Sequence, residues 1–268
     1  MDILARLTDA DLQFVAATVL SDEDRSAAVR RLREEPALLG RLLEDERLIR
    51  RIRGEADVLV RISPWLLFSV LLRDVRRSLR SLRYTVETAQ GERIPVFDAA
   101  RAGELLDDRA LLDYLVLMLT SFTRTESWSL EVEQGGRVQR RRFSDLSSDD
   151  MIALAALMPE ALRFPILRRI GDLALFISGV FPEQADPWYR APGTPITRAG
   201  ARRTLEEYEE EGRRFYRLAA RHEAARRLGL DRILDALADT FPLARKPLNV
   251  LAAEYIHTSR MVLFGERR

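Results

Sequence analysis

Apolar residues recur along most of this chain at the three- and four-residue spacing of an α-helix. The clearest case follows Ser63-Pro64, a pair typical of an N-cap and a first helical position, and predicts a helix over residues 64–83. Its apolar face consists of Phe68, Leu71, Leu72, Val75, Leu79 and Leu82. Similar patterns predict helices over residues 9–20, 36–44, 46–60, 99–120, 149–158, 197–228, 231–241 and 247–264. Two further helices are expected to begin at a cap at Ser21 and at Pro165, and residues 185–195 are expected to form a loop.

Two segments instead alternate apolar and polar residues around a Gln-Gly turn, which predicts β-hairpins at about 84–97 and 128–143. In the second hairpin, Glu131 and Glu133 are expected to pair across the strands with Arg137 or Arg141. The sequence therefore predicts a mainly α fold, a multi-helix bundle with two inserted β-hairpins. We expect an N-terminal helical lobe over 1–62 and a main helical domain over 63–268, or one continuous domain.

The segment Gly171–Glu183, GDLALFISGVFPE, is apolar on every helical face and yet contains Asp172. Asp113 lies in a similar apolar run, LLDYLVLML. A buried carboxylate must find a partner or become neutral, so each acid belongs either to a structural polar network or to a shared pocket with catalytic chemistry. His222 is the third catalytic candidate, with a partly buried, hydrogen-bonded histidine as the default interpretation.

The composition is that of an ordinary soluble protein, with 47% hydrophobic and 32% charged residues and a net charge of +1. Charge is nevertheless uneven along the chain. Residues 1–46 contain eleven acidic residues and six arginines, whereas residues 47–83 contain ten arginines and three acidic residues. Lys246 is the only lysine, so the basic residues are almost all arginine, which we attribute first to GC-rich coding.

The predicted helix after Pro64 places four arginines in one sector away from its apolar face, and the second hairpin adds Arg137, Arg140, Arg141 and Arg142. Such clusters bind phosphate groups, which makes this surface a candidate nucleic-acid interface. The alternative, which we favour, is pairing with the acidic residues of 1–46 and 206–211. The candidate anion-binding residues are Arg73, Arg76, Arg77, Arg80, Arg140, Arg141 and Arg142.

The absence of cysteine excludes disulfides, thiolate zinc sites and cysteine nucleophiles. Glu254 and His257 have a Glu-x-x-His spacing, but a di-iron bundle needs two such pairs, and His257 points away from the apolar face of its helix. We therefore expect no metal and no cofactor.

The N-terminus lacks the pattern of a signal peptide and the longest apolar run is 151–158, which predicts a cytoplasmic protein without a membrane span, from a bacterium or archaeon.

The segments ISPWLLFSVLLRD, RIPVFDA, LLDYLVLMLTSFTR, GDLALFISGVFPE and ARKPLN together resemble a family of bacterial helical proteins with no assigned activity. The resemblance runs through most of the chain. It implies a self-contained helical fold and brings no activity, cofactor or site residue with it.

Three hypotheses for function remain. The first is a non-catalytic protein that acts through protein–protein contacts and associates with itself, because charge is polarised and catalytic residue types are scarce. The second is nucleic-acid binding through the arginine clusters. The third is a small-molecule pocket or carboxylate enzyme around Asp172 and Asp113.

Overall fold

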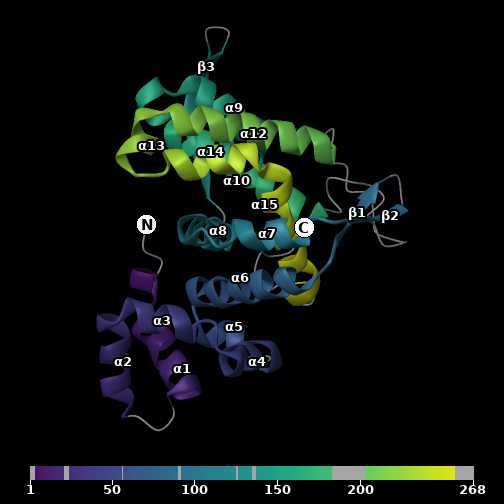
Figure 1. Cartoon of the computed structure of the whole chain (residues 1–268). Helices are drawn as coiled ribbons and strands as arrows, with labels where there is room; N and C mark the ends of the chain where they lie inside the picture. Colours follow the sequence, from purple (N-terminus) through teal and green to yellow (C-terminus); the bar gives the residue numbers. More distant parts are fainter. Residues whose placement is uncertain are drawn as a thin grey trace. The chain divides into compact units, whose positions relative to one another are not determined.

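The computed structural model describes residues 4–20, 24–55, 57–89, 92–124, 126–134, 137–182 and 203–256. It confirms a mainly α fold with two antiparallel β-hairpins (Figure 1). Contacts divide the chain into two compact units. Unit 1 contains residues 1–85, 96–123 and 250–268, and unit 2 contains residues 86–95 and 124–249. The first 62 residues thus share a unit with later helices, whereas the sequence places a boundary after them.

Five helices open unit 1: α1 (Asp9–Val19), α2 (Arg25–Glu34), α3 (Pro36–Leu42), α4 (Glu46–Gly54) and α5 (Val58–Arg61). Asp24 caps α2 by accepting from Ala27 N, while the predicted cap Ser21 lies outside the described residues. The prediction of one continuous helix over 46–60 is wrong. In the structure, α4 ends at Gly54, a residue of low helix propensity, and a separate helix, α5, begins at Val58.

The long helix α6 (Pro64–Ser81) begins as predicted, with the Ser63 hydroxyl accepting from Leu66 N at 3.3 Å. It packs against α7 (Ala99–Leu105) and α8 (Arg109–Ser121) (Figure 1). The sequence pattern predicts α7 and α8 as one helix. The helix is interrupted because the Asp108 carboxylate accepts from Ala110 N at 2.8 Å and so caps a new start.

Asp11 joins the starts of α1 and α6. Its carboxylate is fully buried and accepts from the backbone N–H and hydroxyl of Thr8, at 2.8 and 2.9 Å. It also accepts from the backbone N–H and hydroxyl of Ser63, both at 2.7 Å. One side chain therefore completes the capping box of α1 and holds the N-cap residue of α6.

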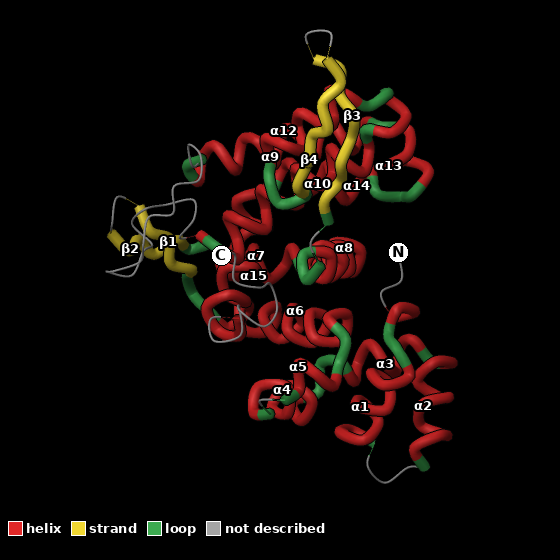
Figure 2. The backbone as a smooth tube through the Cα atoms, turned by 180° about the vertical axis from the view of Figure 1, so that it is seen from behind, coloured by secondary structure: helices red, strands yellow, loops and turns green. Residues whose placement is uncertain are grey.

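Unit 2 is built around two central helices, α10 (Phe164–Val180) and α12 (Leu205–Arg221), which pack against each other. α14 (Asp231–Asp239) lies beside α12, and α9 (Ser148–Leu157) packs on α10 and on strand β4 (Figure 2). The remaining elements are β1 (Thr85–Ala89), β2 (Glu92–Val96), β3 (Ser127–Gln134), β4 (Arg137–Ser144), the short 3-10 helix η2 (Glu160–Leu162), α13 (Glu223–Arg227) and α15 (Phe241–Leu251).

Two of the helices predicted in this half differ from those observed. The helix predicted over 197–228 ends at Arg221, because His222 adopts extended backbone angles (ψ 140°) and starts α13. The last helix begins at Phe241, six residues before its predicted start, and contains Pro247 in its interior. It continues as a π-helical turn over Ala252–Ile256, and residues 257–264 and the predicted loop over 185–195 lie outside the described residues.

The β3–β4 hairpin is antiparallel, with Trp128 opposite Phe143. Phe143 is fully buried and belongs to a core cluster with Met151, Ile170 and Phe215. This register places Glu131 opposite Arg140, and Glu133 opposite Val138, so the predicted pairing of these acids with Arg137 or Arg141 is wrong. In this register, a shift of one residue would turn Phe143 to the opposite face.

Glycines let α10 approach its neighbours closely. A Cβ atom at Gly171 would lie 2.6 Å from the Tyr216 ring of α12, and one at Gly179 would lie 2.6 Å from Leu248 of α15. The apolar helix predicted from GDLALFISGVFPE is therefore a central packing element of unit 2. Within the described residues, none of the helices is both long and apolar enough to cross a membrane.

Candidate functional site

The arginines of α6 are engaged within unit 1. Arg73 is buried and donates to the backbone oxygen of Ser69 at 2.8 Å, and burial lowers the pKa of its guanidinium against the opposing effect of Asp113. The other three form ion pairs with acids of the same unit: Arg76 with Glu44 at 2.7 Å, Arg77 with Asp74 at 2.6 Å and with Glu46 at 3.5 Å, and Arg80 with Asp107. Glu44 and Glu46 belong to the acidic segment 1–46 that the sequence offers as counter-charge, whereas Asp74 and Asp107 lie outside both predicted acidic segments.

Arg140, Arg141 and Arg142 are exposed on β4. Arg142 donates to the hydroxyl of Ser127 at 3.0 Å, and because a hydroxyl is neutral, this contact does not compensate the charge of the guanidinium. Arg141 lies over the Phe143 ring, 4.9 Å from its centroid, and 4.0 Å from Asp150, and Arg140 lies opposite Glu131. The hairpin therefore presents three guanidinium groups at the surface of unit 2.

The buried acid Asp172 is partnered within unit 2. It accepts from the Tyr216 hydroxyl at 3.0 Å and lies 3.7 Å from the guanidinium of Arg168. The Tyr216 ring is the one that covers Gly171, so the same contact packs α10 on α12 and satisfies the carboxylate. This is the structural network that the sequence offered as one of two interpretations.

Asp113 belongs to unit 1 and is also buried. It lies 4.0 Å from Arg109, one helical turn earlier, and acts electrostatically on the buried Arg73. Asp113 and Asp172 therefore belong to different units.

His222 has a structural position at the junction of α12 and α13. Its Nδ1 accepts from Ala224 N at 3.1 Å, and its Nε2 lies 2.9 Å from the backbone oxygen of Glu160, to which it donates. These two bonds define the neutral tautomer with the proton on Nε2. The ring also lies 5.8 Å from that of Phe164, so both nitrogens and one face are engaged in the fold.

The C-terminal pair Glu254 and His257 is described only in part, because His257 lies outside the described residues. Glu254 lies 3.4 Å from Arg53, whose guanidinium also contacts Asp74 at 3.0 Å. The buried Asp74 accepts from the Tyr255 hydroxyl at 2.5 Å. Burial and then this hydrogen bond raise the pKa of Tyr255, which keeps its hydroxyl a donor.

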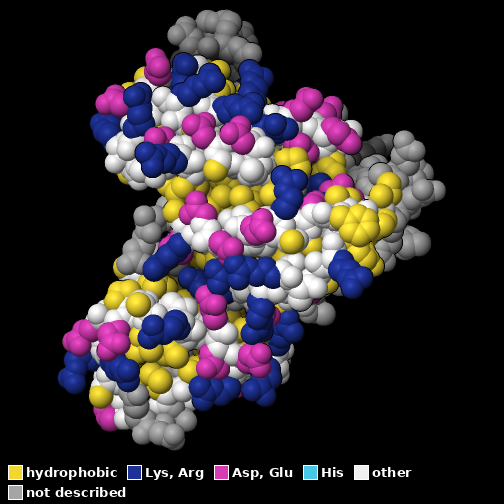
Figure 3. Space-filling model, viewed as in Figure 1, with side chains coloured by type: hydrophobic (Ala, Val, Ile, Leu, Met, Phe, Trp, Pro, Cys, Tyr) yellow, Lys and Arg dark blue, Asp and Glu magenta, His cyan; other side chains and the backbone are white. Residues whose placement is uncertain are grey.

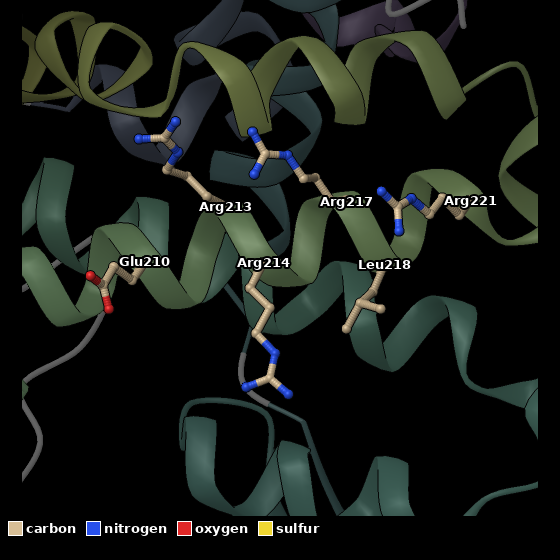
Figure 4. A pocket seen from close by; sticks show the side chains of 6 residues that line it. All are labelled: Glu210, Arg213, Arg214, Arg217, Leu218 and Arg221. Atoms are coloured by element: carbon tan, nitrogen blue, oxygen red, sulfur yellow. The ribbon is translucent and has the colours of Figure 1, made fainter.

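A surface feature that the sequence did not reveal is a shallow groove along α12, with a volume of about 380 Å³. The groove is lined by side chains on two sides of α12. The side chains of Arg213, Arg217 and Arg221 point from one side of the helix, and those of Arg214 and Leu218 point from the other (Figure 4). Glu210 completes the lining. The signal in the sequence is a row of charged residues at four-residue spacing, 213, 217 and 221, on a helix whose other face is apolar.

Charge on the exposed side of α12 changes sign along the helix. Glu206, Glu207 and Glu210 are exposed in its first half, and Arg214, Arg217 and Arg221 in its second half. Arg217 lies 3.0 Å from Asp239 of α14, whereas within the described part of the chain neither Arg214 nor Arg221 has an ion pair. This distribution complements the helix dipole and also gives the surface two halves of opposite charge.

On the face seen in Figure 3, acidic and basic side chains are interspersed. The described residues contain no group of three or more acidic or histidine side chains placed to hold a metal ion. No family model, curated protein or solved structure matches this chain.

Proposed function

We propose that the protein acts through protein–protein contacts, and that the exposed side of α12 is the surface on which two copies of the chain associate. The observation that carries this proposal is the change of sign along α12, from Glu207 and Glu210 to Arg214 and Arg217. A helix with one acidic and one basic half is complementary to a second copy that runs antiparallel to it.

A two-fold arrangement centred near Gly212 would place Glu210 opposite Arg214 of the second copy, and Glu207 opposite its Arg217. Leu218, which is 41% exposed beside the arginines, supplies apolar surface at the same place. A nucleic acid fits this side less well, because the glutamates of the first half would repel phosphate groups. We place this assembly in the cytoplasm, as the sequence predicts.

Charge reversal tests the α12 contact. Glu210→Arg or Arg214→Glu alone should weaken self-association at least about tenfold, equivalent to about 1.4 kcal/mol, because each places like charges opposite each other twice in a symmetric dimer. The double variant with both changes should restore association, since the pairs are only exchanged. Light scattering after size exclusion, over a concentration series and at low and high salt, measures the effect.

Arg227→Glu on α13 is the matched control, because this exposed arginine has the neighbouring Glu223 and lies outside the groove. A wild-type protein that stays monomeric at all concentrations would contradict the proposal. Binding of a nucleic acid or of an acidic protein by the monomer through these arginines would contradict it as well.

Nucleic-acid binding is the second candidate function, now on β4 alone. It is favoured by the three consecutive exposed arginines, of which Arg142 donates to a hydroxyl and not to a carboxylate. If it holds, Arg140→Glu with Arg142→Glu should abolish a gel shift at low salt, and higher salt should weaken the wild-type shift steeply. An unchanged shift in this variant, or no shift in the wild type, would exclude the hairpin.

A further inference from the structure

The end of α13 holds a leucine out to solvent, at the corner where the chain turns from α12 into α14 (Figure 1). Leu228 is 61% exposed, whereas Leu230, two residues later, is buried. Gly229 between them has a φ of 65° and donates from its N–H to the backbone oxygen of Arg226 at 3.1 Å, and Leu230 N donates to Ala225 O at 2.9 Å. These two bonds form a Schellman motif, so the backbone itself fixes Leu228 in its outward position.

The start of α13 is fixed as well. His222 accepts from Ala224 N at 3.1 Å, and its other ring nitrogen lies 2.9 Å from the backbone oxygen of Glu160 in η2. Ala225 is fully buried beneath the helix. The short helix therefore presents its exposed side chains on a rigid support.

Basic side chains surround the exposed leucine. Residues 213–228 contain six arginines and one acidic residue, Glu223. Glu223 lies 3.6 Å from Arg227, while within the described residues neither Arg221 nor Arg226 forms an ion pair, and both are exposed. Two arginines without an acidic partner and one exposed leucine make up this surface, which we call the α13 corner: Arg221, Arg226 and Leu228.

We propose that the α13 corner docks on the surface of a bilayer that contains anionic phospholipids, with Leu228 among the acyl chains and the two arginines at the phosphate groups. An apolar side chain beside basic residues is the composition of segments that lie in a membrane interface. The methylene groups of an arginine can follow the apolar boundary while the guanidinium binds phosphate oxygens. Each basic residue near an anionic bilayer strengthens binding about fivefold.

A nucleic acid fits the corner less well than a bilayer does. Bases stack on aromatic rings, and the apolar side chain that the corner presents is a leucine. The inference is independent of the contact proposed for α12, because Arg226 and Leu228 lie outside the groove of that helix.

Co-sedimentation of the full chain with vesicles tests the corner. The wild type should bind vesicles of phosphatidylglycerol and phosphatidylcholine but not vesicles of phosphatidylcholine alone, and high salt should weaken binding. Arg226→Glu should weaken binding at least about fivefold through the lost charge, and Leu228→Ser should do so through the lost apolar contact. Arg30→Glu on α2 and Val60→Ser on α5 are the matched controls at exposed residues of unit 1, and they should bind as the wild type does.

A fluorescent label reports the position of the corner directly. The chain contains no cysteine, so Leu228→Cys carries an environment-sensitive fluorophore at a single site. Its emission should shift to the blue with anionic vesicles, whereas the emission of labelled Val60→Cys should not change.

The proposal is overturned if the wild type does not bind anionic vesicles, or if Arg226→Glu and Leu228→Ser bind them as the wild type does. Weaker binding of Arg226→Glu with unchanged binding of Leu228→Ser would indicate a phosphate-binding surface without insertion, and it would overturn the bilayer proposal too. Both variants should self-associate as the wild type does in light scattering, which separates this result from that for α12.

Discussion

Replacing Asp11 with asparagine should destabilise unit 1 by at least about 3 kcal/mol, because hydrogen bonds to a charged group contribute roughly 1.5–3 kcal/mol each. The Asp11 carboxylate accepts four such bonds from Thr8 and Ser63 in a fully buried position. The side chain of asparagine has the same shape but turns an NH₂ group toward some of these donors. Urea denaturation followed by circular dichroism measures the loss.

Hydrogen exchange shows whether the loss is local, since the amides at the starts of α1 and α6 should exchange faster than in the wild type. Asp9→Asn is the matched control: this aspartate is 70% exposed and forms a surface ion pair with Arg33, so its loss should cost less than about 1 kcal/mol. Equal effects of the two variants would show that the buried junction does not stabilise the unit.

Replacing Asp145 with asparagine should destabilise unit 2 by about 3–5 kcal/mol, because it removes the charge of a buried carboxylate from the guanidinium of Arg169, whose side chain is only 13% exposed. Asp145 is 3% exposed at the end of β4. Its carboxylate accepts from Arg169 Nη2 at 2.5 Å and from Glu126 N at 3.1 Å, so it fastens the base of the second hairpin to α10. Thermal unfolding and hydrogen exchange of β3 and β4 measure the effect.

A second substitution, at Arg169, distinguishes the contribution of the ion pair from the cost of leaving Arg169 without the Asp145 carboxylate. Asp145→Asn combined with Arg169→Met should recover much of the lost stability, because an apolar replacement of a buried ion pair is often close to neutral. Asp149→Asn, at a carboxylate that is 80% exposed beside Arg203, is the surface control. A double variant less stable than Asp145→Asn would contradict this account.

The buried acids show how far sequence patterns reach. An acid on an apolar helix predicts a buried network, and Asp172 has one. One partner, the Tyr216 hydroxyl, lies 44 residues away in the chain, and no local spacing identifies it. Asp11 looks like an ordinary first-turn acid in the sequence, because its contacts with Ser63 depend on how α1 meets α6.

The candidate sites show the same division. The arginines after Pro64 form an obvious basic sector in sequence, but Glu44 and Asp107 compensate them from other helices. The burial of Arg245 and Lys246 was not predicted, because adjacent basic residues normally indicate exposed surface. Both are buried in α15, and the carboxylate that they share, that of Glu87, comes from a strand 158 residues before Arg245.

The sequence by itself determined the mainly α class, the two hairpins and most helix starts, because apolar periodicity and capping residues act over one or two turns. Helix breaks at Gly54, Asp108 and His222 were harder to predict, since the apolar pattern continues across them. Only the tertiary structure decided how the chain divides into units, which charges are compensated and which cations are buried. These properties depend on contacts between residues distant in the chain, where a few ångströms separate a solvated charge from a buried one.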